Sequence, residues 1–256
     1  MFSIEFLNRV RNYEIEKIAE HFPPGATVLE IGGGTGYQAK QLADRGFVVT
    51  SIDVSGSNYR DKQVFPVLEY DGKRFPFERN TFDLVFSSNV LEHVVDLSQL
   101  HQETRRVLKP DGYCIHVMPT SMWRFWTSVT NYVELAQRLV LLLPALIPES
   151  INPHEVLRPF RVTKRAWELV RYYAVPPRHG EIGSVVSELW TFSSRHWLRH
   201  FTVHQFEILG REPLGLSYTG HMVLGSHWSI PSRQRAAKIL GSSCFLYKVK
   251  PRSCDA

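Results

Sequence analysis

The chain has 256 residues, of which 43% are hydrophobic and 21% are charged, and its formal net charge is +5. This composition is typical of a globular protein and excludes a fibre or a disordered chain. The basic residues are scattered and no nucleic-acid-binding motif accompanies them, so we expect a solvated surface and no nucleic-acid partner. The three cysteines form no CxxC pair, which indicates a reducing, cytoplasmic compartment without a disulfide framework.

A membrane-spanning segment is not expected. The N-terminus lacks a basic region followed by an uninterrupted apolar stretch, so no secretory signal peptide is indicated. The longest apolar run, residues 139–148, contains Pro144 and is shorter than the roughly 20 apolar residues of a spanning helix. The expected location is therefore the cytoplasm, and peripheral contact with a membrane surface stays open.

Short apolar strands alternate with helical segments through the first 119 residues. Apolar residues at helical spacing predict a helix over residues 4–22, which Pro23-Pro24-Gly25 ends. The elements predicted next are a strand over 27–31, a helix over 37–45, strands over 47–52, 64–70 and 82–87, a helix over 97–108, a turn over 109–112 and a strand over 113–118. This alternation predicts an α/β protein with a doubly wound, mostly parallel sheet that is covered on both faces.

The alternation is interrupted after Pro119. Residues 120–190 are rich in aromatic and apolar residues, and we predict a helical insertion over the C-terminal edge of the sheet, where open α/β sheets bind ligands. The pattern resumes with a helix over 191–201 and strands over 206–216 and 244–249, with a second, smaller insertion over 218–243. We therefore expect one domain, 1–256, made of a cofactor-binding half over 1–119, a substrate lid over 120–190 and a C-terminal part over 191–256.

The glycine-rich segment after the first strand can be compared with known nucleotide-binding loops. Its sequence, Val28-Leu-Glu-Ile-Gly-Gly-Gly-Thr-Gly36, lacks the Gly-Lys-Ser/Thr ending of a phosphate-binding loop. A dinucleotide-binding GxGxxG pattern needs a small residue at the position that Tyr37 occupies. What remains is a GxGxG pattern that begins at Gly32 and is preceded by Glu30.

This segment resembles motif I of the class I S-adenosylmethionine-dependent methyltransferases, and later segments resemble their further motifs in the same order. Those segments are Ser51-Ile-Asp-Val-Ser55, Tyr70-Asp-Gly72 before Phe75-Pro-Phe77, residues 80–93, and Arg106-Val-Leu-Lys-Pro-Asp-Gly112. The pattern is similar to the small-molecule methyltransferases that include the ubiquinone and menaquinone enzymes. The resemblance implies a seven-stranded Rossmann-like sheet with a helical insertion after the fifth strand, and S-adenosyl-L-methionine as the cofactor.

The resemblance also implies which residues bind the cofactor. The glycines let the backbone approach its methionine end, Glu30 favours its cationic amino group, and Asp53 accepts both ribose hydroxyls. Asp71 accepts the adenine amino group, and Val54 packs against the ring. The full set of expected cofactor-binding residues is Glu30, Gly32, Gly33, Gly34, Gly36, Tyr37, Asp53, Val54, Asp71, Gly72, Ser88 and Asn89.

Simpler local roles stay open for some residues. Asp53 alone could cap a helix, Asp71 could be a turn residue, and Glu92-His93 could be a pair at a helix start. Some relatives carry Glu-x-x-Glu-His in this helix as part of a divalent-metal site. Here Asn89 stands in place of the first carboxylate, so we expect no metal.

Methyl transfer from a sulfonium mainly requires alignment in a dry pocket, and a general base is needed only for some acceptors. If the acceptor is a hydroxyl, a histidine near the methyl group should accept its proton. The eligible histidines are His93, His154, His179, His221 and His227. We favour His179, with Glu181 close enough in the sequence to orient its ring and His93 as a further candidate.

The aromatic and apolar residues of 120–190 favour packing within the domain or in a homodimer, followed by a hydrophobic substrate pocket or membrane contact. The leading hypothesis is an enzyme that methylates a small or lipid-linked acceptor, at oxygen. The alternatives are a methyltransferase acting on protein or RNA, and a non-catalytic subunit that binds the cofactor and regulates a partner. A cofactor titration followed by a turnover assay separates an enzyme from a binding protein.

Overall fold

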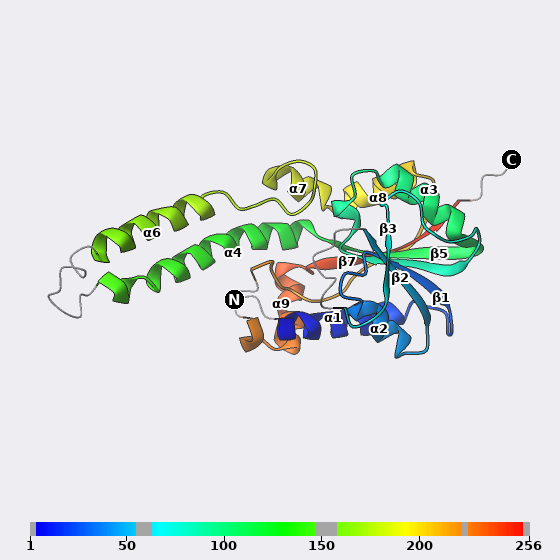
Figure 1. Cartoon of the computed structure of the whole chain (residues 1–256), viewed down its shortest axis with the longest axis horizontal. Helices are drawn as coiled ribbons and strands as arrows, with labels where there is room; N and C mark the ends of the chain where they lie inside the picture. The colour runs from blue at the N-terminus through cyan, green and yellow to red at the C-terminus, as the bar shows by residue number, and fades with distance from the viewer. Residues whose placement is uncertain (1–3, 55–62, 147–157, 222–224, 253–256) are drawn as a thin grey trace.

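A seven-stranded sheet with helices on both faces forms the body of the protein (Figure 1). The computed structural model describes residues 4–54, 63–146, 158–221 and 225–252. The strand order is β3-β2-β1-β4-β5-β7-β6; the first five strands are parallel, and β7 is antiparallel to both of its neighbours. The predicted doubly wound, mostly parallel sheet is confirmed.

Of the four strands that carry the predicted site and its neighbours, three are largely buried because helices cover both of their faces, and β2 is buried at Ser51 and Ile52. They are β1 (Thr27–Ile31), β2 (Val48–Val54), β4 (Phe82–Ser88) and β5 (Leu108–Pro119). The outer strands are β3 (Val67–Tyr70), β7 (Cys244–Pro251) and β6 (Phe206–Pro213). The strand order reverses between β1 and β4, and ligands of open α/β sheets bind at the carboxyl ends of the strands beside such a point.

Two helical layers enclose the sheet (Figure 1). On one face lie α3 (Leu97–Val107) and α8 (Ser194–Val203), which bury side chains such as Leu100 and Phe201 against the strands. On the other face lie α1 (Ile4–Ala19) and α2 (Tyr37–Ala43), which contribute Ile15 and Leu42, while α9 (Ile230–Leu240) lies beside α1. The apolar residues of each helix recur at helical spacing, which explains why both faces of the sheet become covered.

A long helical hairpin follows β5 and extends away from the sheet (Figure 1). It consists of α4 (Ser121–Val140), the 3₁₀ turn η3 (Leu143–Leu146) and α6 (Arg158–Tyr173), after which α7 (Val185–Thr191) returns to the sheet. The expected helical content is present, but most of the hairpin projects outward, and only its base and α7 lie near the C-terminal edge. The projection begins where Thr120 caps α4, its hydroxyl accepting a hydrogen bond of 3.0 Å from the Trp123 N–H.

Several element boundaries differ from those predicted. β3 begins at Val67, since Pro66 has no N–H to donate to a ladder. Residues 109–112, expected to form a turn, lie within β5, where the pairing with β4 is irregular. Residues 185–203 form two helices, and the hydroxyl of Ser193 caps the second. The second insertion, 218–243, contains the 3₁₀ turn η4 (Gly225–His227) and α9.

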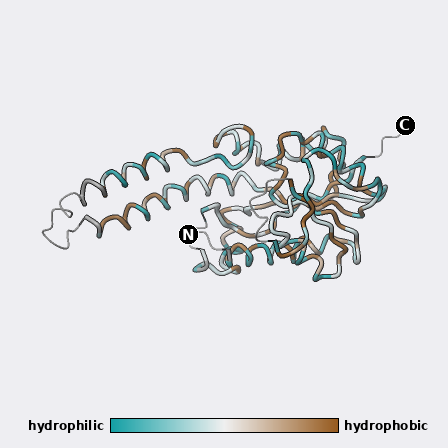
Figure 2. Tube along the Cα trace, viewed as in Figure 1, coloured by the Kyte–Doolittle hydropathy of each residue, from teal (hydrophilic) through white to brown (hydrophobic). Residues whose placement is uncertain are grey.

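Hydrophobic residues concentrate in the strands and also recur along the hairpin (Figure 2). On α4, Phe125, Val129, Tyr132 and Val133 are exposed and lie on one side of the helix. No helix among the described residues is long and apolar enough to cross a membrane. The hairpin is therefore an amphipathic projection with an apolar stripe that no described part of the chain covers.

Candidate active site

The glycine-rich turn is held against the end of β2 by backbone hydrogen bonds. The N–H groups of Gly32 and Gly33 donate to the carbonyl of Ile52 at 2.8 and 3.1 Å. A Cβ on Gly33 would lie 1.9 Å from Oγ of Ser51. Gly36 has a φ of 73°, and a Cβ at this position would lie 2.7 Å from a carbonyl oxygen. Both positions therefore require glycine, and the turn presents bare backbone at the carboxyl end of β1.

Glu30 lies beneath this turn and is 2% exposed. Its Oε2 accepts a hydrogen bond of 2.6 Å from the Ser51 hydroxyl. Burial raises the pKa of the Glu30 carboxyl to about 7, although the hydrogen bond from Ser51 acts in the opposite direction and lowers the pKa. A cationic group placed above the turn would favour the ionised carboxylate, so the position suits the positively charged amino group of an amino-acid ligand.

Asp53 stands at the end of β2 and its carboxylate bonds to the glycine turn. Its Oδ2 accepts from the N–H of Gly34 at 2.9 Å, and its Oδ1 accepts from the N–H of Val54 at 2.8 Å. The predicted acid and the predicted glycines are thus brought together in one place. The residues that would test a helix cap at Asp53, 55–62, lie outside the described residues.

Asp71 and Gly72 follow β3 and are exposed. Asp71 Oδ1 accepts from the N–H groups of Lys73 and Arg74 at 2.8 and 2.9 Å, and these hydrogen bonds lower the pKa of the carboxyl. Asp71 therefore fills the turn role that the sequence left open. A Cβ on Gly72 would lie 3.6 Å from the side chain of Val54, so the residues expected at the adenine end lie near one another.

Tyr37, Ser88 and Asn89 link the turn to α1. The hydroxyl of Tyr37 donates to the Asn12 side chain at 2.8 Å. Asn89 has a φ of 54° and its N–H donates to Val117 at 2.8 Å, which fixes the chain as it leaves β4. Oγ of Ser88 lies 3.3 Å from the amide nitrogen of Asn89. Tyr37 and Ser88 therefore connect the glycine turn and the end of β4 to α1.

A buried polar network next to Ser88 was not predicted. The Glu14 carboxylate accepts hydrogen bonds from Arg11 at 2.8 Å and from the Tyr218 hydroxyl at 2.7 Å. Arg11 also donates to Ser88 at 3.3 Å, and the hydroxyl of Tyr218 lies 3.2 Å from Sγ of Cys244. One feature of the sequence does indicate this network: Glu14 lies beside Ile15 on an otherwise apolar side of the first helix. A carboxylate in that position must find polar partners when the chain folds.

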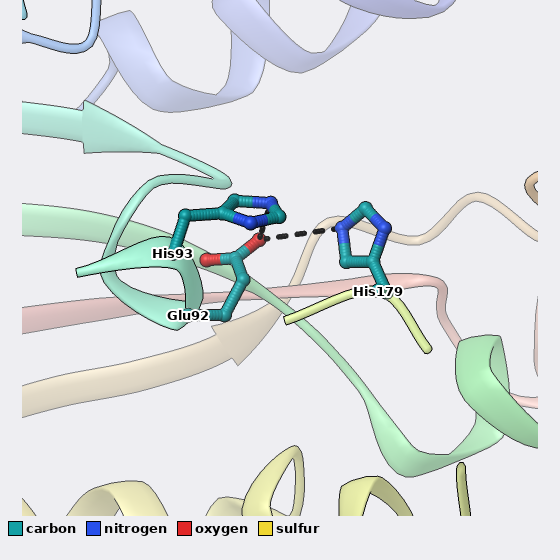
Figure 3. Close-up of side chains that lie close together, drawn as sticks. All are labelled: Glu92, His93 and His179. Atoms are coloured by element: carbon teal, nitrogen blue, oxygen red, sulfur yellow. Dashed lines mark ion pairs between the residues drawn. The ribbon is translucent and has the colours of Figure 1, made fainter. Parts of the chain in front are cut away.

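Of the predicted histidines, His93 and His179 come together although they are far apart in the sequence. Their ring centroids are 4.8 Å apart (Figure 3). Glu181, expected to orient His179, instead faces Nδ1 of His93 at 3.9 Å. The side chain of Glu92, whose involvement was not predicted, lies between the two rings, with Oε1 3.8 Å from Nε2 of His179.

The other histidine candidates lie outside this cluster. His221 pairs with Glu134 of α4 at 2.7 Å, and His227 lies in η4. His154 lies outside the described residues. His93 and His179 are thus the described candidates that approach the end of β4.

His179 is held in place through its backbone. The N–H groups of His179 and Gly180 donate to Oε1 of Glu188 at 2.7 and 2.8 Å. Glu188 pairs at 3.0 Å with Arg124, whose side chain is 2% exposed and donates to the carbonyl of Pro177 at 2.9 Å. A buried ion pair between α4 and α7 therefore fixes the segment that carries His179, which sequence reasoning did not detect.

A pocket of about 270 Å³ lies beside His179 at the base of the hairpin. Its wall includes the rings of Trp123 and His179, whose centroids are 4.6 Å apart, together with Thr127 and Pro177. Larger hollows of about 980 and 660 Å³ lie near residues 109–112 at the opposite end of the sheet. We assign the site to the smaller pocket, because ligands of open α/β sheets bind at the carboxyl ends of the strands.

Residues 29–116 match the protein family described as Methyltransferase domain. The biotin biosynthesis bifunctional protein BioHC of Cellvibrio japonicus is 34% identical over 118 residues, which are 42% of this chain and 24% of that protein. Demethylmenaquinone methyltransferase of Corynebacterium urealyticum is 36% identical over 94 residues, which are 35% of this chain and 40% of that protein. The chain spans less than half the length of these curated relatives.

The whole fold is also shared with solved structures. An S-adenosylmethionine-dependent methyltransferase from Methanosarcina mazei superposes with a TM-score of 0.54 at 16% identity, covering 92% of this chain and 96% of that chain. The family match lies on β1 to β5, the strands that carry the glycine turn and Asp53. Residues 29–116 therefore match the Methyltransferase domain family, and the fold around them is the one found in solved S-adenosylmethionine-dependent methyltransferases.

Proposed function

We propose that this protein is an enzyme that transfers a methyl group from S-adenosyl-L-methionine to a small or lipid-linked acceptor. The observation that carries the proposal is the hydrogen bond between the Gly34 N–H and Asp53, which joins the bare glycine turn to a carboxylate at the next strand end. Such a site offers backbone to the methionine end of the cofactor and a carboxylate to its ribose. Glu30 beneath the turn complements the cationic amino group.

The acceptor site that we propose is the pocket beside His179. The segment that carries His179 lies close to the segment that follows β4, because a Cβ on Gly180 would lie 2.9 Å from the carbonyl of Glu92, and Val90 of that segment lies against Gly32 of the cofactor turn. A hydroxyl acceptor there would be activated by His179 or His93, since a neutral imidazole accepts a proton near neutral pH. Oxygen is accordingly the acceptor atom that we propose.

The test is transfer of radiolabelled methyl groups from S-adenosyl-L-methionine to separated polar and lipid fractions of a cell extract. We expect label in a small-molecule or lipid fraction, and we expect the Asp53→Ala variant to lose it. Label confined to protein or RNA would replace the proposed acceptor class. Cofactor binding without any transfer would instead favour a regulatory, non-catalytic subunit.

The apolar stripe on α4 supports a lipid-linked acceptor. Phe125, Val129, Tyr132 and Val133 are all exposed and line a shallow groove that also includes Ala136. An exposed apolar face on a projecting amphipathic hairpin suits peripheral contact with a membrane surface, where a lipid-carried acceptor would be met.

Sedimentation with phospholipid vesicles tests this surface. We expect the wild-type chain to sediment with vesicles and the Val129→Glu variant to stay in the supernatant. Val186→Glu is a matched control, because Val186 of α7 is 74% exposed and lies outside the stripe. A dimer that only Val129→Glu dissociates, without vesicle binding, would assign the stripe to a homodimer and remove this support for a lipid-linked acceptor.

A further inference from the structure

Three ligating side chains gather beyond the end of β4, and we refer to Glu92, His93 and His179 as the triad. One ligand atom from each lies within 4.8 Å of the others (Figure 3). Oε1 of Glu92 is 3.9 Å from Nε2 of His93 and 3.8 Å from Nε2 of His179. The two rings approach the same carboxylate oxygen from different elements.

The Glu92 carboxylate is the most informative member of the triad. Its side chain is 0% exposed, yet no described residue gives a hydrogen bond to Oε1 or Oε2. Buried carboxylates are ordinarily paired, hydrogen-bonded or bound to a metal, because an unpaired buried charge is strongly disfavoured. The imidazole nitrogens at 3.8 and 3.9 Å are beyond hydrogen-bonding distance, so the space between these atoms calls for a further group.

The sequence predicted no metal here because Asn89 replaces a carboxylate, but His179 supplies a third ligand from a distant segment. From these contacts we propose that the triad binds one divalent transition-metal ion. Ligand atoms about 2.1 Å from a tetrahedral ion lie roughly 3.4 Å apart, so the two carboxylate–imidazole separations of 3.9 and 3.8 Å need to shorten by about half an ångström and the widest separation, up to 4.8 Å, by about 1.4 Å. Two imidazoles and one carboxylate leave at least one coordination position for a solvent molecule or a substrate oxygen. Imidazole ligands favour ions such as Zn²⁺ over Mg²⁺, which prefers oxygen ligands.

The structure holds the triad in position before any ion binds. The N–H of Glu181 donates to the carbonyl of Glu92 at 3.3 Å, which ties the segment bearing His179 to the segment bearing His93. A Cβ on Gly180 would lie 2.9 Å from that carbonyl, so the close approach needs glycine. The carboxylate of Glu181 faces Nδ1 of His93, the nitrogen opposite the ligand atom, which is where outer carboxylates orient metal-binding histidines.

The ion would deepen the proposed function, and this part of the inference rests on that function. His179 borders the acceptor pocket, so an open coordination position of the ion is within reach of a bound acceptor. A divalent ion lowers the pKa of a coordinated hydroxyl. In this form of the mechanism the two histidines hold the ion, which replaces the base role proposed for them above, and the proton of the coordinated hydroxyl would pass to solvent.

Isothermal titration of the chelator-treated full chain with Zn²⁺ tests the site without reference to methyl transfer. We expect one ion per chain, and at least a hundredfold weaker binding for His179→Asn and Glu92→Gln. Loss of even an outer partner weakens metal sites about 10–100-fold, so loss of a ligand should exceed that. The matched control is His221→Asn, which removes a histidine of the same pocket that is paired with Glu134 and lies outside the triad.

Thermal unfolding supplies a second readout, because an ion that binds only the folded chain raises its melting temperature. Zn²⁺ should stabilise the wild type and His221→Asn but not His179→Asn, whose ring is 35% exposed and can be replaced without disturbing the core. Absence of Zn²⁺ binding by the wild type, or equal binding by His179→Asn, would overturn the proposal. Failure of the proposed function would appear separately, as absent binding of S-adenosylhomocysteine or absent methyl transfer.

Discussion

The pKa of Glu30 gives a quantitative prediction about cofactor binding. The pKa is about 7 in the free protein, because the carboxyl is buried beneath the glycine turn. The carboxylate is then about nine tenths ionised at pH 8 and about one tenth ionised at pH 6. If only the ionised form accepts the cationic amino group of the cofactor, the apparent affinity should fall about tenfold between these pH values.

Titration of the chain with S-adenosylhomocysteine at pH 6, 7 and 8 measures this dependence. Glu30→Gln should bind more weakly than the wild type at pH 8 and should lose the pH dependence. Glu20→Gln is the control, because the side chain of Glu20 is 64% exposed on the far end of the first helix. Equal affinity of the wild type at pH 6 and pH 8 would refute the assigned role of Glu30.

The same pKa has a consequence for folding. A carboxyl whose pKa is raised on folding stabilises the chain fully below its unfolded value, near 4.5, and loses that contribution as the pH rises through about 7. Glu30→Gln should therefore stabilise the ligand-free chain at pH 8 by up to about 3 kcal/mol, from 1.36 kcal/mol per unit of pKa. Urea denaturation measures the difference, and no gain in stability at pH 8 would contradict the raised pKa.

Three further predictions follow from other contacts. Asp53→Ala should weaken S-adenosylhomocysteine binding by about 1.5–3 kcal/mol in calorimetry, and an unchanged affinity would remove Asp53 from the site. Burial lowers the pKa of His101 to about 2 and of His116 to about 3. The two neutral rings therefore contribute fully to the stability of the fold above pH 6.5, and the free energy of unfolding measured in urea should decline as the pH falls below that value. Arg124→Met should destabilise the chain by about 3–5 kcal/mol, because it removes the cation that pairs with the buried Glu188 carboxylate, and an unchanged midpoint in urea denaturation would contradict a stabilising ion pair.

The cofactor half of the fold could be predicted because its signals are local. The apolar run that ends at Ile31 is followed by the glycine-rich turn, and the next predicted strand ends on Asp53. Because adjacent parallel strands have their carboxyl ends at the same edge of the sheet, the glycine-rich turn and Asp53 must lie close together. The helical content of the insertion could also be predicted. Its outward direction could not, because the apolar residues of α4 were expected to cover the sheet and are exposed instead.

The histidine candidates show the same limit at the level of single residues. His93 and His179 were both named from the sequence, but their proximity depends on how Glu188 and Arg124 hold the returning segment. Glu92 was weighed as part of a helix-start pair and as part of an incomplete metal-binding pattern, and nothing local indicates that its carboxylate would be buried without a hydrogen bond. Contacts between distant segments are set by packing, which periodicity and motif spacing do not encode.

Cofactor choice is the most direct test of the central claim. Calorimetric titration of the full chain with S-adenosylhomocysteine and, separately, with NAD compares the two classes of ligand that glycine-rich turns of this kind bind. We predict one S-adenosylhomocysteine site per chain and no measurable binding of NAD, because Tyr37 occupies the position where the dinucleotide pattern needs a small residue. Binding of NAD without binding of S-adenosylhomocysteine would contradict the account.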